Sequence, residues 1–122
     1  MLKEISREEL SDLIESGEDF KLVDVLSRES FAKGHIKGAV SIPLAEIGRK
    51  SAKLLKKRDK IVTYCASFEC SASTTAARKL IALGYKNVFD YKGGLKDYQE
   101  GGLSLETGAG QADKKCTVCG GA

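Results

Sequence analysis

Residues 61–83 have the sequence IVTYCASFECSASTTAARKLIAL, and this stretch decides the fold. Its first four residues form a short β-rich run, which predicts a buried strand over residues 61–64. Residues 71–83 predict a helix with small and apolar side chains at helical spacing, namely Ala72, Ala76, Leu80 and Leu83. The strand runs directly into Cys65, so the five residues that follow this cysteine must form a loop between the strand and the helix.

Strand and helix signals continue to alternate on both sides of this stretch. Ser6 and Glu9 form a capping box at the start of a helix that ends at Gly17. Further patterns predict strands over residues 20–25, 39–42 and 87–90, a short helix or turn over 27–34, and helices over about 45–57 and 95–98. The helix over 45–57 is expected to turn three side chains inward, those of Ile47, Leu54 and Leu55. This alternation predicts an α/β fold with a mainly parallel sheet.

The composition is that of one ordinary globular domain. The chain has 122 residues, of which 42% are hydrophobic and 30% charged, and this length can bury a core without disulfide bonds. The net charge of +3 is too small to indicate nucleic acid or a membrane surface as a partner. The basic side chains between residues 49 and 58 are interpreted as a solvated helix face, because no aromatic residues alternate with them.

The expected location follows from the N-terminus and the cysteines. No apolar leader is visible, and no apolar stretch approaches the roughly 20 residues that a membrane-spanning helix needs. We therefore expect a cytoplasmic protein, in which cysteines normally stay reduced. The four cysteines are then better interpreted as reactive or metal-binding than as a disulfide framework.

The composition changes near residue 107. Residues 1–106 hold all the predicted elements, whereas residues 107–122 are expected to form a flexible tail with little apolar content. The tail contains Cys116 and Cys119 in a single CxxC pair. Three interpretations stay open: half of a zinc site shared by two chains, because zinc needs four ligands; a dithiol that reduces a persulfide or passes sulfur on; or no role. We assign no metal site and no cofactor to the chain.

Cys65 is the candidate nucleophile because of its position. In open parallel sheets, ligands bind beyond the carboxyl ends of the strands. The loop after Cys65 can turn several backbone N–H groups inward to bind an anion, and the following helix N-terminus adds positive potential. Both effects are expected to lower the pKa of Cys65 from its ordinary value of about 8.5. The alternative is a buried structural cysteine, and position alone leaves the two interpretations nearly balanced.

Several short motifs follow one another along the chain. In the front half these are LVDV at residues 22–25, FAKGHIKGA at 31–39 and SIP at 41–43; in the back half they are YC at 64–65, LGY at 83–85 and GGL at 93–95. In this order they resemble the motifs of rhodanese-like domains. The resemblance covers about residues 5–106. It implies a five-stranded parallel sheet flanked by helices, and a sulfurtransferase that carries sulfane sulfur as a persulfide on Cys65.

The loop after Cys65 is the expected anion-binding site. Its candidate residues, whose backbone N–H groups would hold the sulfur anion, are Ala66, Ser67, Phe68, Glu69, Cys70 and Ser71, with the Ser67 and Ser71 hydroxyls as further donors. From Cys65 to Cys70 the loop has six residues, which is the length found in sulfur-handling members. Related dual-specificity phosphatases have seven, and phosphate would also require a guanidinium group where Cys70 stands. The phosphatase interpretation is therefore poor.

Departures from the family pattern bear on the substrate. Phe68 replaces the usual glycine, Glu69 lies within the loop, and Leu26 occupies a position where arginine is common. An inward-facing Glu69 would raise the pKa of Cys65 and repel thiosulfate. Thiosulfate is therefore in doubt as a donor, and polysulfide or a protein persulfide is more attractive. The acceptor would be a thiol or another nucleophile, with a sulfur-relay protein as a candidate partner.

Three further residues have competing interpretations. Cys70 could attack a persulfide on Cys65 or protect Cys65 from over-oxidation. We favour the interpretation that Cys70 only fills the position that an arginine occupies in other members of the family. His35 could form a Cys–His dyad, whereas the resemblance implies a mainly structural role at the turn before the second strand. Asp24 is expected to hydrogen-bond local backbone near the loop.

Two other functions stay open from the sequence. A thiol–disulfide redox protein would use Cys65 with Cys70, or the tail dithiol, and would form a reversible intramolecular disulfide. A non-catalytic module would bind a partner or a sulfur-bearing ligand without turnover, and its binding would be unaffected by Cys65→Ala.

Overall fold

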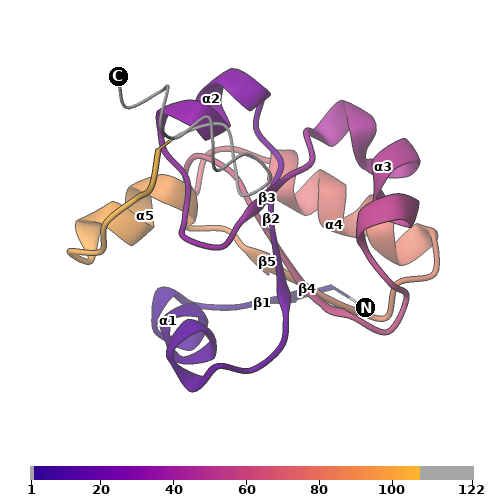
Figure 1. Cartoon of the computed structure of the whole chain (residues 1–122), viewed down its shortest axis with the longest axis horizontal. Helices are drawn as coiled ribbons and strands as arrows, with labels where there is room; N and C mark the ends of the chain where they lie inside the picture. The colour runs from indigo at the N-terminus through magenta and orange to yellow at the C-terminus, as the bar shows by residue number, and fades with distance from the viewer. Residues whose placement is uncertain (1, 108–122) are drawn as a thin grey trace, which may run out of the picture.

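The computed structural model of this chain describes residues 2–107 (Figure 1). The elements in chain order are β1 (Lys3–Glu4), α1 (Arg7–Ser16), β2 (Lys21–Asp24), α2 (Arg28–Lys33), β3 (Val40–Ser41), the 3₁₀ turn η1 (Leu44–Glu46), α3 (Ile47–Leu54), β4 (Lys60–Tyr64), α4 (Ala72–Ala82), β5 (Asn87–Tyr91) and α5 (Gly94–Glu100). The strands form one five-stranded sheet in the order β1-β5-β4-β2-β3, with every pair parallel. The predicted α/β fold with a parallel five-stranded sheet is confirmed.

Part of the predicted tail lies outside the described residues. Cys116 and Cys119 belong to that part, so the three interpretations of the CxxC pair stay predictions. Among residues 2–107, no helix is long and apolar enough to cross a lipid bilayer.

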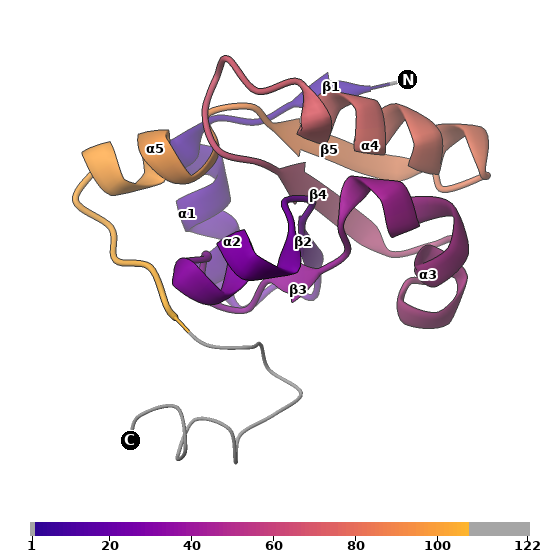
Figure 2. The ribbon, with the colours of Figure 1, turned by 90° about the horizontal axis from the view of Figure 1, so that it is seen from above.

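Helices cover both faces of the sheet, as the view from above shows (Figure 2). Successive side chains of a strand point to opposite faces. In β4 and just beyond it, Ile61 and Cys65 therefore pack with α3 and α4, whereas Val62 and Tyr64 pack with α1, α2 and α5. Cys65 thus belongs to the core on the α3–α4 face.

The first helix forms for the reason expected from the sequence. The Ser6 hydroxyl accepts a hydrogen bond from the Glu9 amide at 3.1 Å, and the Ser6 amide donates to Glu9 Oε1 at 2.8 Å. Gly17 ends the helix with a φ of 75°, in the left-handed region that favours glycine. The capping box and the glycine stop are both confirmed.

Several details of the sequence prediction are wrong. The predicted helix over 45–57 is the 3₁₀ turn η1 followed by α3, which ends at Leu54. Leu55 has extended backbone and its side chain is buried in the core, whereas the side chain of Leu54 is 46% exposed. Leu83 is 43% exposed because it follows the last turn of α4. Strand β1, which was not expected from the sequence, has only two residues, both exposed.

The topology brings three strand ends to one edge of the sheet. β4 is the central strand, and its last residue, Tyr64, lies beside Asp24 of β2 and Tyr91 of β5. Cys65 follows directly, at the carboxyl edge where ligands bind in open parallel sheets.

Candidate active site

Cys65 is fully buried, and its thiol faces acceptor oxygens. Its Sγ lies 3.3 Å from the carbonyl oxygen of Cys70, 4.0 Å from that of Ser67 and 3.5 Å from the hydroxyl of Ser73. Burial raises the pKa of Cys65, and the Cys70 side chain raises it further, while the Ser73 hydroxyl and amide act in the opposite direction. The expected lowering of this pKa is therefore wrong, because burial and the Cys70 side chain outweigh the effect of Ser73.

The second sulfur of the loop has the amide environment that was expected for the first. Cys70 is half-buried, and although burial opposes its ionisation, the Cys65 thiol and the backbone N–H groups of Ala66 and Ala72 together place its pKa below the ordinary value. A turn closed by the Cys70 amide, which donates to the Ser67 carbonyl at 3.0 Å, folds the loop back on itself. The thiol with the greater tendency to ionise is thus that of Cys70.

Helix α5 fixes the direction of the first loop peptides. The amides of Leu95 and Lys96 donate to the carbonyls of Cys65 and Ala66 at 3.0 and 2.9 Å. In a trans peptide the C=O and N–H groups point in opposite directions, so the amides that follow these carbonyls point away from α5. Gly94 permits this approach: its φ is +64°, and a Cβ there would lie 2.3 Å from the Cys65 carbonyl oxygen.

A buried polar chain that the sequence analysis missed starts at Cys65. The Cys65 thiol donates toward Ser73 Oγ, Ser73 Oγ donates to Asp90 Oδ1 at 2.6 Å, and the Thr74 hydroxyl donates to Asp90 Oδ2 at 2.6 Å. Thr63 holds the Ser73 backbone by donating to its carbonyl at 3.0 Å. The hydroxyl that reaches Cys65 is therefore that of Ser73, and not the expected Ser67 or Ser71.

Two polar residues in the predicted strands could have indicated this chain of hydrogen bonds. Thr63 and Asp90 interrupt the apolar runs of β4 and β5 and lie opposite each other in the sheet. Both are fully buried, and buried polar groups need partners, so such a pair indicates a polar network in the core.

Comparison with known proteins identifies the family. The family model for the rhodanese-like domain matches residues 6–101. The chain belongs to the rhodanese-like domain family. This domain is similar to a protein named sulfurtransferase from Allochromatium vinosum, with 32% identity over 86% of this chain and 95% of the relative. Sulfur transfer is therefore the role supported at the level of the family.

Two further similarities extend this result. An HTH-type transcriptional regulator of Mycobacterium tuberculosis, Rv0324, is 37% identical over 86% of this chain and 45% of its own length. The chain spans about half the length of this regulator and of another curated relative that it matches. The crystal structure of the BH2092 protein from Bacillus halodurans superposes with a TM-score of 0.81 at 33% identity, covering 88% of this chain and 79% of that one.

A small pocket lies beside the Cys65 loop of this rhodanese-like domain. The loop pocket has a volume of about 170 Å³ and is lined by Ser67, Phe68, Glu69, Lys96, Asp97 and Glu100. Phe68 is 63% exposed there. Arg7 pairs with Asp97 at 3.0 Å, and the Tyr91 hydroxyl also donates to this carboxylate at 2.7 Å. Of the three acidic groups in the pocket, Asp97 is therefore paired with Arg7, whereas Glu69 and Glu100 share the pocket with one basic group, Lys96.

His35 and Asp24 support the rhodanese-like fold around the site. His35 Nδ1 lies 2.8 Å from the Phe31 carbonyl oxygen, and the two rings stack with centroids 3.8 Å apart. Phe31 packs on the face of the sheet opposite to Cys65, which gives no support to a Cys–His dyad. Asp24 Oδ1 accepts the expected local hydrogen bond from the Leu26 amide at 2.9 Å, and burial raises the pKa of Asp24.

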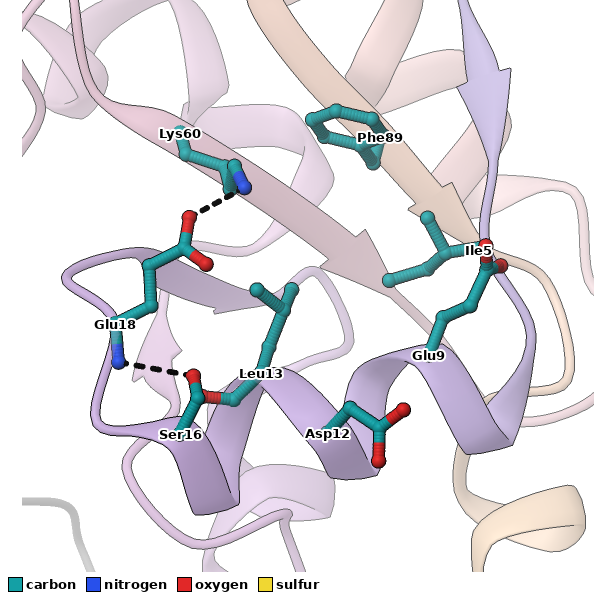
Figure 3. A pocket seen from close by; sticks show the side chains of 8 residues that line it. All are labelled: Ile5, Glu9, Asp12, Leu13, Ser16, Glu18, Lys60 and Phe89. Carbon is teal, nitrogen blue, oxygen red and sulfur yellow. Dashed lines mark hydrogen bonds and ion pairs between the residues drawn. The ribbon is translucent and has the colours of Figure 1, made fainter.

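The larger cavity of the domain lies elsewhere (Figure 3). It has a volume of about 360 Å³ between α1 and the strands, and it is lined by Ile5, Glu9, Asp12, Leu13, Ser16, Glu18, Lys60 and Phe89. Lys60 begins β4, whereas Cys65 follows its end. Among the residues that line this cavity, only Ser16 has a hydroxyl group, and this hydroxyl donates to the Leu13 carbonyl. This cavity adds no group to the Cys65 chemistry.

Proposed function

We propose that this protein is a sulfurtransferase that takes a sulfane sulfur onto Cys65, stores it as a persulfide and passes it to an acceptor thiol. The observation that carries the proposal is the position of Cys65. It directly follows the central strand of a rhodanese-like sheet and begins the six-residue loop that leads to α4. Parallel sheets place their ligands at this edge.

The reaction has two displacement steps. The Cys65 thiolate attacks the sulfane sulfur of the donor, a new S–S bond forms, and the donor's S–S bond breaks with its electron pair leaving on the donor. An acceptor thiolate then attacks the outer sulfur of the persulfide. This step breaks the bond to Cys65 and restores its thiolate.

The buried thiol requires a route for its proton. Because burial raises the pKa of Cys65, few thiolates form unless a nearby group accepts the proton. Ser73 accepts from the thiol and donates to Asp90, so the proton can pass through the hydroxyl toward a buried carboxylate. In this proposal Ser73 contacts the reacting sulfur, and Asp90 acts as a positioning residue through Ser73.

The loop pocket favours donors other than thiosulfate. Glu69 and Glu100 give it an excess of negative charge, which repels a small dianion. Phe68 offers an exposed apolar contact next to the loop. These features favour polysulfide or the persulfide of another protein, with a sulfur-relay protein as the partner. Cys65 and Cys70 are free thiols, and we place the activity in the cytoplasm, where thiols stay reduced.

Mass spectrometry of the full chain tests the proposal. The reduced protein is incubated separately with thiosulfate, an inorganic polysulfide and an organic persulfide, and then alkylated and digested. Fragment ions that divide the peptide between Cys65 and Cys70 locate the added sulfur. We expect one extra sulfur on Cys65, and none on this peptide in Cys65→Ser.

A double variant, Cys116→Ser/Cys119→Ser, controls for sulfur held on the other two thiols. It should load Cys65 as the parent protein does. No loading of Cys65 by any of the three donors in Cys70→Ser, which lacks the second thiol of the loop, would contradict the proposal, as would undiminished loading of Cys70 in Cys65→Ser.

A further inference from the structure

Resting on this proposed function, we propose that the same loop has a second activity. Cys70 attacks the persulfide of Cys65, releases the sulfane sulfur as hydrogen sulfide ion and leaves a Cys65–Cys70 disulfide. The protein would then deliver sulfur to an acceptor when one is bound, and discharge it as sulfide when none is.

The position of the two cysteines carries this inference. They begin and end one short loop, and Cys65 Sγ lies 3.3 Å from the carbonyl oxygen of Cys70. The turn closed between Ser67 and Cys70 brings residue 70 back toward the strand end. Each of the two thiols also affects the pKa of the other. Residue 70 therefore lies next to the Cys65 thiol, and is not held away from it.

The surroundings of the two sulfurs favour Cys70 as the attacking thiolate and Cys65 as the sulfur that is attacked. Cys65 is fully buried and faces carbonyls, whereas Cys70 is half-buried and has the amides of Ala66 and Ala72 beside its sulfur. Amides stabilise a thiolate, and the thiolate is the form that attacks an S–S bond. Burial and the nearby Asp90 carboxylate act against the ionisation of Cys70, but the pKa of Cys70 still lies below its ordinary value. Cys70 is therefore suited to attack, and Cys65 to hold the sulfur that is attacked.

The step balances in atoms and charge. The Cys70 thiolate attacks the inner sulfur of Cys65–S–SH, the Cys65–Cys70 bond forms, and the bond to the outer sulfur breaks. The outer sulfur leaves as HS⁻ with the electron pair of that bond, so it is reduced to sulfide while the two cysteine sulfurs are oxidised to a disulfide. A dithiol reductant restores both thiols by exchange before the next cycle.

The experiment uses the full chain carrying Cys116→Ser and Cys119→Ser, so that the tail thiols cannot take part. The protein is loaded with polysulfide, freed of excess donor by rapid desalting, and kept without any added thiol. Released sulfide is measured over time, and the protein mass is recorded in parallel. We expect about one sulfide per persulfide initially bound, with the protein ending two hydrogens lighter than its reduced form.

In the same background, Cys70→Ser separates this activity from loading. It should bind sulfur on Cys65 and keep it, with at least a tenfold slower release of sulfide (a rough threshold for loss of the attacking thiolate). Thr75→Ala, which removes an exposed hydroxyl on α4 outside the loop, should release sulfide like the parent. Equal release from Cys70→Ser, or transfer of the intact persulfide to Cys70, would overturn the inference while the proposed function stands. Failure of both proteins to load would overturn the two together.

Discussion

The Ser73 hydroxyl donates a 2.6 Å hydrogen bond to Asp90 Oδ1, and both residues are fully buried. This hydroxyl presents a lone pair to Cys65 Sγ, 3.5 Å away. In the proposed proton route it passes its own proton to the carboxylate, and the proton that it takes from the thiol then forms a hydrogen bond to the thiolate. The two residues thus give a buried thiol an acceptor in a core that otherwise disfavours its ionisation.

Ser73→Ala is expected to slow the loading of Cys65 by about 100-fold, the usual contribution of a positioned proton acceptor. Since the Ser73 hydroxyl lowers the pKa of Cys65, its removal should also move the midpoint of the rate–pH profile to higher pH. Single-turnover loading measured from pH 6 to pH 10 checks both effects (a range chosen around the ordinary thiol pKa of about 8.5).

Three further variants show whether a slower rate in Ser73→Ala comes from the loss of the proton route. Ser73→Thr keeps a hydroxyl and should recover much of the rate, whereas Asp90→Asn should behave like Ser73→Ala. Thr75→Ala removes an exposed hydroxyl of the same helix, one that bonds only the Ser71 carbonyl, and should leave the profile unchanged. A Ser73→Ala profile that coincides with the parent's would refute the proton route.

Gly94→Ala tests how α5 holds the loop. A left-handed residue with a side chain costs about 1–3 kcal/mol, and here the added Cβ also meets the Cys65 carbonyl oxygen at 2.3 Å. We expect a loss of at least that size in the free energy of unfolding, together with a severe loss of loading. Urea denaturation and the loading assay measure the two effects.

Gly48→Ala is the matched control for this substitution. Gly48 lies in α3 with no atom within 4 Å of an added Cβ, so alanine should stabilise the protein by about 0.5–1 kcal/mol. Similar stability and loading in the two alanine variants would show that the contact between α5 and the loop is unimportant.

Asp24 should make stability depend on pH. Burial raises its pKa in the folded protein above the unfolded value, so the folded state binds the proton more tightly. Its contribution to stability is then fully present below the ordinary carboxyl pKa of about 4 and is lost as pH rises through the higher folded value. Asp24→Asn, which keeps an acceptor for the Leu26 amide, should therefore unfold at a higher temperature than the parent at pH 7.

The advantage of Asp24→Asn should shrink as the pH falls toward 4 (about the unfolded carboxyl pKa). Thermal unfolding followed by circular dichroism at several pH values gives the comparison. An asparagine variant less stable than the parent at pH 7 would mean that the carboxylate contributes more through its bonds than it loses by burial.

The charge of the loop pocket should control the use of thiosulfate. Glu69→Gln combined with Glu100→Gln removes two negative charges and is expected to raise the second-order rate of loading from thiosulfate about two- to fivefold. Added salt should diminish this gain because it screens exposed charges. Glu15→Gln, an exposed change on α1 outside the loop pocket, should have no effect. An equal response in both proteins would exclude a local role for the pocket.

The fold was predictable because its signals are local and repeated. The capping box at Ser6, the β-rich run that ends at Cys65 and the family motifs all correspond to elements of the structure. β1 was not predictable in this way, since its two exposed residues form a strand only through their pairing with β5. Leu54 was assigned to the core because the periodicity of a helix does not indicate where the helix ends.

The site was predictable in its position but not in its electrostatics. The sequence indicates that a loop follows Cys65, but it does not indicate which peptide groups of that loop turn toward which sulfur. Those directions depend on α5, which is about thirty residues further along the chain and holds the carbonyls of Cys65 and Ala66. Ser73 and Asp90 were missed for a similar reason, because their partnership joins a helix to a distant strand.

The short strand β1 has a consequence for anyone who engineers this protein. It covers the outer edge of β5, the strand that contains Asp90, and the Ile5 amide donates to the Asp90 carbonyl at 3.1 Å. Without residues 2–5, the hydrogen-bonding groups along that edge would be left open to strands from other molecules, a known route to aggregation. Affinity tags and truncations at the amino terminus can therefore disturb β5, the strand whose Asp90 hydrogen-bonds Ser73 beside Cys65.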